Sequence, residues 1–208
     1  MEEAIRHGFW IVPTLPLLPA EDGEATARLT GRNAPGELTS AKSPDQLAAG
    51  ISRFLSGDSV LFWDLGNGRA SEQLGQLTRT AKAIQKADPN RPIGADVWDG
   101  FQDYTQPLQM IGSHRFPLMT SLELTGYRDW LQQRRYLAGD GKFTWTWIQT
   151  HVPEWEAKLL YDQSTDQAFK EPIGPQPEQI RLMTYLSLAS GCKGLGFWSD
   201  KFLADSHT

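Results

Sequence analysis

Six short apolar runs, rich in β-branched and aromatic residues, alternate with helical segments along this chain. They cover residues 9–15, 60–65, 92–98, 110–116, 143–149 and 194–198. Runs of this length and composition are typical of strands buried on both faces of a sheet. Strands that alternate with helices at this spacing form right-handed βαβ units, so the sequence predicts an α/β fold with a parallel sheet.

Helix start signals lie between these runs. Ser43-Pro44-Asp45 precedes QLAAGISRFL, Ser71 precedes EQLGQLTRTAKAIQKA, and Pro177 opens PEQIRLMTYLSLASG, which closes at Gly191. A serine at the N-cap or a proline at the first helical position satisfies or removes backbone donors that a helix start leaves unpaired. The three segments are therefore predicted to be helices.

An open doubly wound sheet and a closed barrel both fit the alternation. Five of the eight tryptophans fall within the expected strands or at their carboxyl ends, where both folds bind ligands. These are Trp63, Trp98, Trp145, Trp147 and Trp198. GLGF near residue 194 and GNGR near residue 66 lack the glycine spacing that cradles a phosphate. We therefore expect a barrel and no nucleotide cofactor.

The composition excludes several classes of partner. A net charge of -5 with scattered basic residues disfavours nucleic acid, and no stretch approaches the ~20 apolar residues of a membrane span. Cys192 is the single cysteine, so no internal disulfide can form. Secretion or a periplasmic location would follow if a leader lies upstream. Two long loops, 16–43 and 151–177, either shape a site or are surface insertions.

The segment SVLFWDLGNGRASEQLGQLTRTAKAIQKADPNRPIGADVW resembles the fourth and fifth units of the clan A glycoside hydrolases. AIRHGFWIVPTLP is similar to their third unit, and IRLMTYLSLASGCKGLGFWSD to their last helix and eighth strand, most like the β-galactosidase branch. The resemblance implies a (β/α)8 TIM-type barrel, with residues 1–208 forming units three to eight. Such barrels usually take ~250 residues, so a fragment without the first two β/α units is expected.

Glycoside hydrolysis in this clan needs two carboxyl groups, one acting as acid and one as nucleophile or base. The resemblance places the acid at Gly68, after Gly66-Asn67, and the second carboxylate at Gln149, in TWTWIQTH. Neither residue can supply that chemistry. Glu123 and Glu154, in loops after the sixth and seventh strands, are the fallback catalytic candidates, although most strand-end carboxylates are loop caps or solvated charges.

The substrate-binding candidates are polar and aromatic residues near strand ends. They are Asn67, Asp64, Trp98, His114, Gln149, His151, Trp155, Trp198 and Asp200. The resemblance gives Asn67 the sugar 2-hydroxyl, but a left-handed turn residue is an equal alternative. His114 faces either the site or a neighbouring carbonyl. Trp63, Trp145 and Trp147 fit a core, whereas Trp98, Trp155 and Trp198 fit stacking platforms.

Two functions of different class follow from these residues. One is a non-catalytic pseudo-glycosidase that binds a saccharide or glycoside, which Gly68 and Gln149 favour. The alternative is an active glycoside hydrolase with relocated carboxylates such as Glu123 or Glu154. The histidines show no HxH or HExxH spacing, so no metal is expected unless His114 and His151 converge with Asp200. The sequence specifies no cofactor and no oligomeric state.

Overall fold

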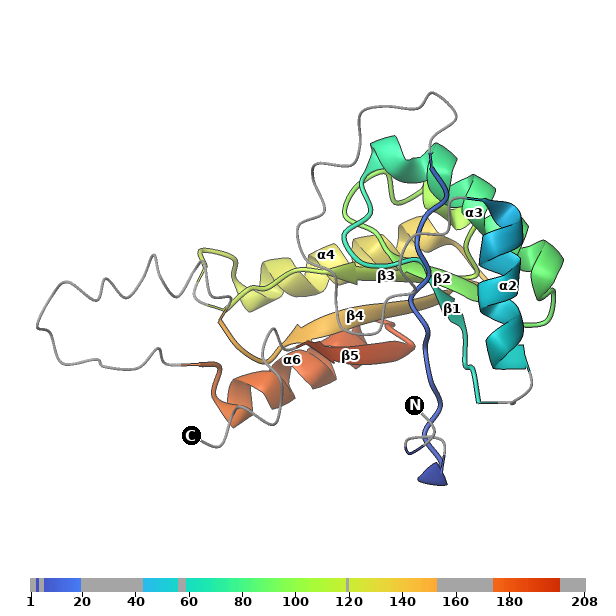
Figure 1. Cartoon of the computed structure of the whole chain (residues 1–208). Helices are drawn as coiled ribbons and strands as arrows, with labels where there is room; N and C mark the ends of the chain where they lie inside the picture. Colours follow the sequence, from blue (N-terminus) through green and yellow to red (C-terminus); the bar gives the residue numbers. More distant parts are fainter. Residues whose placement is uncertain are drawn as a thin grey trace, which may run out of the picture. The chain divides into compact units, whose positions relative to one another are not determined.

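The computed structural model describes residues 3, 6–19, 43–55, 59–118, 120–152 and 174–198, with the side chain of Trp198 left out (Figure 1). The chain divides into two compact units. Unit 1 comprises Met1–Gly112 and Leu137–Phe143, and unit 2 comprises Ser113–Tyr136 and Thr144–Thr208. The two units are described separately below.

Helices and strands alternate along the described chain, as the sequence predicts. In chain order they are α2 (Pro44–Leu55), β1 (Trp63–Asp64), η1 (Ser71–Gln73), α3 (Leu74–Ala87), β2 (Ile93–Asp96), η2 (Asp103–Thr105), β3 (Met110–His114), α4 (Leu124–Ala138), β4 (Phe143–Gln149), α6 (Pro177–Ala189) and β5 (Gly194–Trp198). The strands follow one another in the sheet order β1-β2-β3-β4-β5. The α/β class with a parallel sheet is therefore confirmed.

Unit 1 holds the first parallel pairings. Trp63 pairs with Ile93, and Gly94 pairs with Met110. The segment predicted as a strand over 9–15 forms only two isolated parallel bridges, Ile11 to Val60 and Thr14 to Asp64. Pro13 lies between them and has no N–H to donate, so the ladder cannot run through it.

The α3 segment begins differently from the prediction. Ser71 is the first residue of a 3₁₀ turn and not the cap; the Ala70 N–H instead bonds to the Gln73 side chain at 3.2 Å. The Ser71 N–H donates to the Asp99 carboxylate, so Ser71 is tied to the segment after β2. At α2 the prediction is confirmed, because the Ser43 hydroxyl accepts the Gln46 N–H at 3.3 Å.

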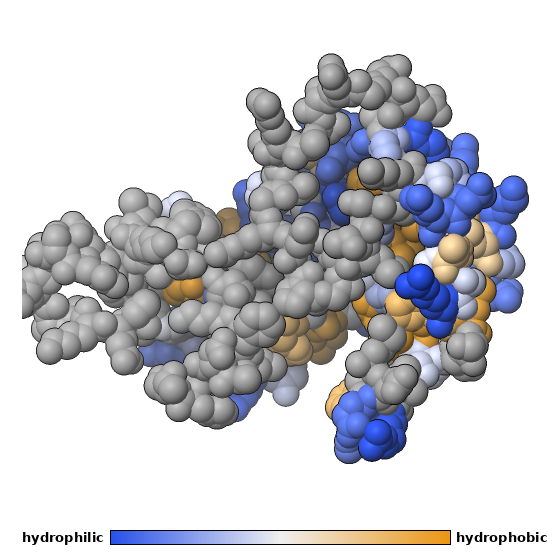
Figure 2. Space-filling model, in the orientation of Figure 1, coloured by the Kyte–Doolittle hydropathy of each residue, from blue (hydrophilic) through white to orange (hydrophobic). Residues whose placement is uncertain are grey.

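The core of unit 1 lies between α3 and the strands. Leu77 and Ile84 of α3 are buried together with Trp63 and Ile93. Figure 2 shows hydrophilic residues over much of the α2 and α3 side of this unit, with apolar residues visible between them. Apolar packing of one helix face against a sheet is the expected source of stability for such a layer.

Asp88, in the Asp-Pro-Asn-Arg-Pro segment, is a structural centre of unit 1. Its carboxylate is 3% exposed and accepts the Trp63 indole N–H at 3.0 Å, an Arg91 guanidinium N–H at 2.9 Å and the Asn90 N–H at 3.2 Å. Arg91 also donates to the Val60 carbonyl at 3.1 Å. This segment therefore ties the end of α3 to the chain entering β1 and β2.

Unit 2 is built around β4 and β5. They pair in parallel from Trp145 opposite Gly194 to Gln149 opposite Trp198. A Cβ on Gly196 would lie 2.3 Å from the Trp147 ring, so the indole occupies the space that a side chain there would need. Glycine on β5 is the residue that permits a tryptophan on β4.

The two faces of β4 have different neighbours. The buried Tyr127 hydroxyl of α4 interacts with Thr146 of β4 and Ser187 of α6. Thr146 therefore points toward the helices, and because successive side chains alternate across a strand, Trp145, Trp147 and Gln149 lie on the opposite face. In a barrel that opposite face is the interior.

No helix in the described ranges is long and apolar enough to cross a bilayer.

Candidate functional site

Two aspartates lie at the carboxyl ends of neighbouring strands in unit 1. Asp64 ends β1 and accepts the Thr14 hydroxyl at 2.9 Å, while Asp96 ends β2, is fully buried, and accepts the Gly68 N–H at 3.1 Å. Burial raises the pKa of Asp64; the Thr14 hydroxyl, the Gly66 N–H and the charge of Arg69 oppose this rise, and the charge of Asp96 adds to it. Both carboxylates are thus built into the protein's own polar network.

A tight turn from Gly66 to Arg69 follows β1. Gly66 and Gly68 adopt φ values of +92° and +64°, which L side chains rarely adopt, and Asn67 lies exposed between them. The Arg69 guanidinium lies against Gly66, and its Nε donates to the Leu65 carbonyl at 2.6 Å.

The backbone of Arg69 joins this turn to the end of β2. Its N–H donates to the Asp96 carbonyl, and its carbonyl accepts the Trp98 N–H, each at 2.9 Å. The exposed Asn67 and Trp98 therefore belong to two segments that are hydrogen-bonded through Arg69. We refer to Asn67, Trp98 and the turn Gly66–Arg69 as the Asn67–Trp98 edge.

Gly68 occupies the position to which the resemblance assigns the acid. A Cβ there would meet no atom within 4 Å, so space for a side chain exists. Its left-handed backbone would strain any residue with a Cβ, and its N–H is committed to Asp96. The turn therefore has a conformation that suits glycine.

Gln149, at the other family position, ends β4 in unit 2 and is 1% exposed. Its Oε1 accepts the Leu118 N–H at 3.0 Å, and its Nε2 donates to the Leu118 carbonyl at 3.5 Å. The backbone N–H and C=O of one residue, Leu118, thus bond to both ends of the side-chain amide. A carboxylate could accept the first of these bonds but could not donate the second.

The two histidines that the sequence suggests as binding candidates lie at or just beyond the ends of strands. His114 is the last residue of β3, half-buried, with its ring 5.3 Å from that of Phe116. His151 lies two residues beyond β4 and is also half-buried. Within the part of the chain that the structure describes, no three His, Cys, Asp or Glu side chains are grouped to hold a metal ion.

The tryptophans separate by exposure. Trp63 is fully buried, Trp145 is 8% exposed and Trp147 is partly buried, as expected for core residues, whereas Trp98 is 57% exposed. Trp98 has the accessibility that a stacking platform needs. Trp198 belongs to β5 by its backbone, and its side chain lies outside the described residues.

Glu123 precedes α4 and is exposed. Its carboxylate accepts the Thr125 hydroxyl at 3.3 Å, and its carbonyl accepts the Tyr127 N–H. These contacts are those of a residue at a helix start. The other fallback carboxylate, Glu154, lies outside the described residues, as do Trp155 and Asp200.

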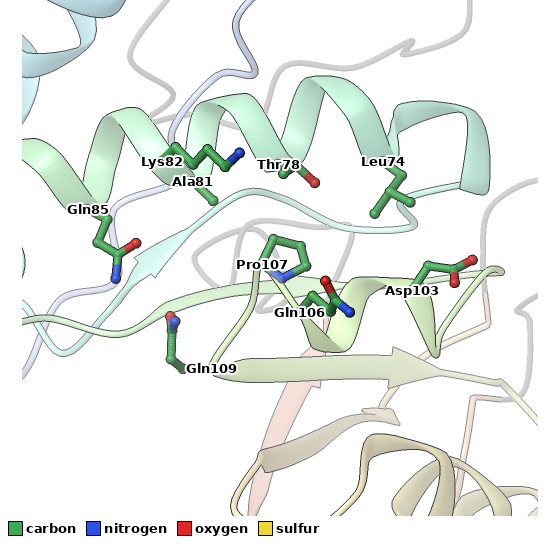
Figure 3. A pocket seen from close by; sticks show the side chains of 9 residues that line it. All are labelled: Leu74, Thr78, Ala81, Lys82, Gln85, Asp103, Gln106, Pro107 and Gln109. Carbon is green, nitrogen blue, oxygen red and sulfur yellow. The ribbon is translucent and has the colours of Figure 1, made fainter.

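A groove of about 400 Å³ lies on the helix side of unit 1 (Figure 3). Its walls come from α3 and from residues 103–109 around η2, and its charged members are Lys82 and Asp103. The short η2 turn stands where a full helix would follow β2 in a regular βαβ unit. None of the strand-end residues of β1 and β2 lines this groove, so it is separate from the Asn67–Trp98 edge.

Some contacts at these positions could not be predicted from the sequence. The Leu118 backbone groups that bond to Gln149 lie 31 residues away in the chain. Arg69 follows Gly66-Asn67-Gly68 at a position to which the resemblance assigns no role. Thr14 could have been suspected, because it lies near the carboxyl end of the expected strand over 9–15, next to the strand that carries Asp64.

Several solved glycoside hydrolases share this fold. A β-D-glucuronidase from Dictyoglomus thermophilum aligns with 97% of this chain at 13% identity and a TM-score of 0.58. A proposed α-L-fucosidase from Bacteroides thetaiotaomicron aligns with 74% of it at 8% identity and a TM-score of 0.54. A GH2 β-galacturonidase from Eisenbergiella tayi aligns with 75% at 16% identity and a TM-score of 0.51.

The chain spans only part of these enzymes: 37% of the glucuronidase, 52% of the fucosidase and 29% of the galacturonidase. No protein-family model matches the sequence, and no curated protein matches it. At these identities the likeness defines the fold, which is that of a partial glycoside hydrolase-like (β/α)8 barrel.

Proposed function

We propose that this chain is a saccharide-binding, non-catalytic relative of the glycoside hydrolases. The observation that carries the proposal is the Gln149 amide, which bonds to both the backbone N–H and the backbone C=O of Leu118 in a position that is 1% exposed. A residue that acts as nucleophile must reach the anomeric carbon of a substrate. The side chain at the position that the resemblance assigns to the nucleophile is instead buried and engaged in a structural contact.

The acid position supports the same conclusion. Gly68 has no proton to give, and its N–H holds Asp96 in the protein's own network. Removing both carboxylates removes the groups that assist departure of the leaving group and stabilise the oxocarbenium-like transition state. Glu123, which caps α4, does not replace them in this proposal.

Saccharide binding is proposed for the Asn67–Trp98 edge. The apolar face of a sugar ring stacks on an indole, and its hydroxyls bond to amides such as that of Asn67. The turn and the end of β2 are joined by two backbone hydrogen bonds of 2.9 Å, so the two groups need little ordering when a ligand binds.

The absence of catalysis is tested with a panel of aryl glycosides. We expect no turnover above the uncatalysed rate for the wild-type protein, and no difference for Glu123→Gln. Robust turnover that Glu123→Gln or Glu154→Gln abolishes would establish relocated carboxylates and overturn the proposal.

Binding is tested by calorimetric titration with neutral mono- and disaccharides. Trp98→Ala should weaken binding about fivefold or more, because an aromatic contact contributes roughly 1 kcal/mol beyond its area burial. Trp10→Ala is the matched control, since Trp10 is 60% exposed in the same unit but lies in the segment before β1. Equal effects of the two substitutions would remove the assignment of Trp98.

A further inference from the structure

We propose that the Asn67–Trp98 edge takes uncharged saccharides and rejects uronic acids, because its cation, Arg69, is a positioning residue bound to the protein itself. This inference rests on the proposed function and names the class of sugar that the edge accepts.

The first step is the engagement of Arg69. Its Nε donates to Leu65 at 2.6 Å, and its guanidinium packs on Gly66 so closely that a Cβ there would lie 2.2 Å from it. It also interacts electrostatically with Asp64. The guanidinium therefore stabilises the turn and is engaged by the protein's own groups, which disfavours it as a receptor for a ligand anion.

The second step is the balance of charge. Arg69 contributes one positive charge, and Asp64 and Asp96 each contribute a negative charge when ionised. Asp99, in the segment after β2, adds another, with its carboxylate bonded to Ser71. Counting these described residues, a uronate carboxylate near Trp98 would meet net negative charge, and like charges at short range repel.

Other cations of unit 1 lie elsewhere among the described residues. Those of α2 and α3 belong to helices on the outside of the sheet, and Arg91 and Lys142 lie just before β2 and β4, at the amino ends of the strands. Arg91 is bonded to Asp88, and Lys142 to the Leu108 carbonyl. These two therefore stand at the strand ends opposite the edge.

This selectivity would separate the chain from enzymes that share its fold. The Eisenbergiella tayi β-galacturonidase was solved with galacturonate bound. A barrel of the same kind in which the described cation at this edge, Arg69, is bound by the protein itself is expected to discriminate against that chemistry, because specificity is a difference between two affinities.

The experiment compares sugars that differ only at C6. Methyl β-D-galactopyranoside and the corresponding methyl galactopyranosiduronate are titrated into the full chain, with the glucose pair as a second set. We expect the neutral sugar to bind about tenfold more tightly at low salt, and the ratio to shrink at high salt as screening removes the repulsion.

Three variants locate the cause. Asp64→Asn removes one negative charge and should bring the ratio closer to one. Arg69→Met should weaken the neutral sugar, as a positioning role requires, and should weaken the uronate at least as much, because one positive charge is lost. Arg53→Met, which removes an exposed cation of α2, should change neither affinity. If a variant fails to fold, the salt dependence of the wild-type ratio still decides.

The outcomes are distinct. A uronate that binds as tightly as the neutral sugar, or that alone loses affinity in Arg69→Met, overturns this inference and leaves the proposed function standing. If no saccharide binds, the proposed function fails, and the inference fails with it.

Discussion

Substituting Gln149 by Glu restores the residue type that the family resemblance expects, and the structure predicts that it destabilises the protein. The carboxylate keeps the bond from the Leu118 N–H but faces the Leu118 carbonyl, which now lies 3.5 Å from an amide nitrogen. A buried carboxylate without a compensating donor costs several kcal/mol if it stays ionised. It is expected to remain protonated instead, and a protonated Glu can donate to that carbonyl.

The free energy needed to keep the new carboxyl group protonated sets the size of the expected loss of stability. Holding a Glu neutral at pH 7 costs ~1.4 kcal/mol for each of the roughly 2.7 pH units above its ordinary pKa of ~4.3, so the ceiling is about 4 kcal/mol. We expect a loss of about 2 to 4 kcal/mol at pH 7 and under about 1 kcal/mol at pH 4. Because the pKa of the new Glu is higher in the folded state than in the unfolded state, the variant is most stable below the unfolded-state pKa. Its stability then falls as the pH rises.

The assay is urea unfolding followed by tryptophan fluorescence, with the difference from wild type taken at each pH. Gln109→Glu is the matched control, because Gln109 is exposed and uses only its oxygen, which accepts the Ile93 N–H at 3.0 Å. A carboxylate can do the same, so that variant should stay within about 0.5 kcal/mol of wild type. A Gln149→Glu protein as stable as wild type at both pH values would refute the structural role of the amide.

Three further outcomes follow from named contacts. Asp88→Ala should lower the free energy of unfolding by about 3 to 5 kcal/mol in the same urea assay, since it removes the partner of a half-buried guanidinium and of a buried indole N–H. Asp129→Ala, which breaks an exposed pair, should cost under about 1 kcal/mol. Burial raises the pKa of Asp88, but the bonds from Arg91, Trp63 and Asn90 outweigh this effect and lower the pKa overall. The stability advantage of the wild type over Asp88→Ala should therefore be present above about pH 4 and disappear as pH falls further. An advantage that grows in acid would contradict this prediction. Gly196→Ala should cost about 1 to 3 kcal/mol of stability, because the new methyl group displaces the Trp147 ring. Gly75→Ala, in α3 with open space around it, should be neutral or stabilising, and thermal unfolding of the two variants measures the difference.

The strands were predictable where local pattern and pairing agree. Residues 143–149 and 194–198 are short apolar runs without a proline, and both form strands with the predicted bounds. The segment 9–15 has the right composition, but Pro13 divides its pairing into two bridges. The expected strands over 92–98 and 110–116 end earlier, at Asp96 and His114. Hydrophobic periodicity locates a strand, whereas its ends depend on pairing partners that the pattern does not contain.

The site was predictable at the level of residue type. The sequence separated the exposed Trp98 from the core tryptophans, whereas its assignment of Gly68 and Gln149 to the positions of the family carboxylates stays a prediction. The environment of these residues could not be predicted from the sequence, because it depends on backbone groups such as the Leu118 N–H and on the left-handed φ of Gly68. A sequence motif does not specify which backbone groups its side chains will contact.

The positions that the resemblance assigns to the two carboxylates are held in structural contacts. At Gly68, the backbone adopts a conformation that favours glycine, and its N–H is bound to a buried aspartate. At Gln149, the side-chain amide bonds to the backbone N–H and C=O of Leu118. Each residue is held by a neighbour in its own unit, so a substitution by Glu meets backbone strain at Gly68 and the cost of protonating a buried carboxyl at Gln149. Restoring one carboxylate alone is therefore expected to destabilise the fold without producing turnover.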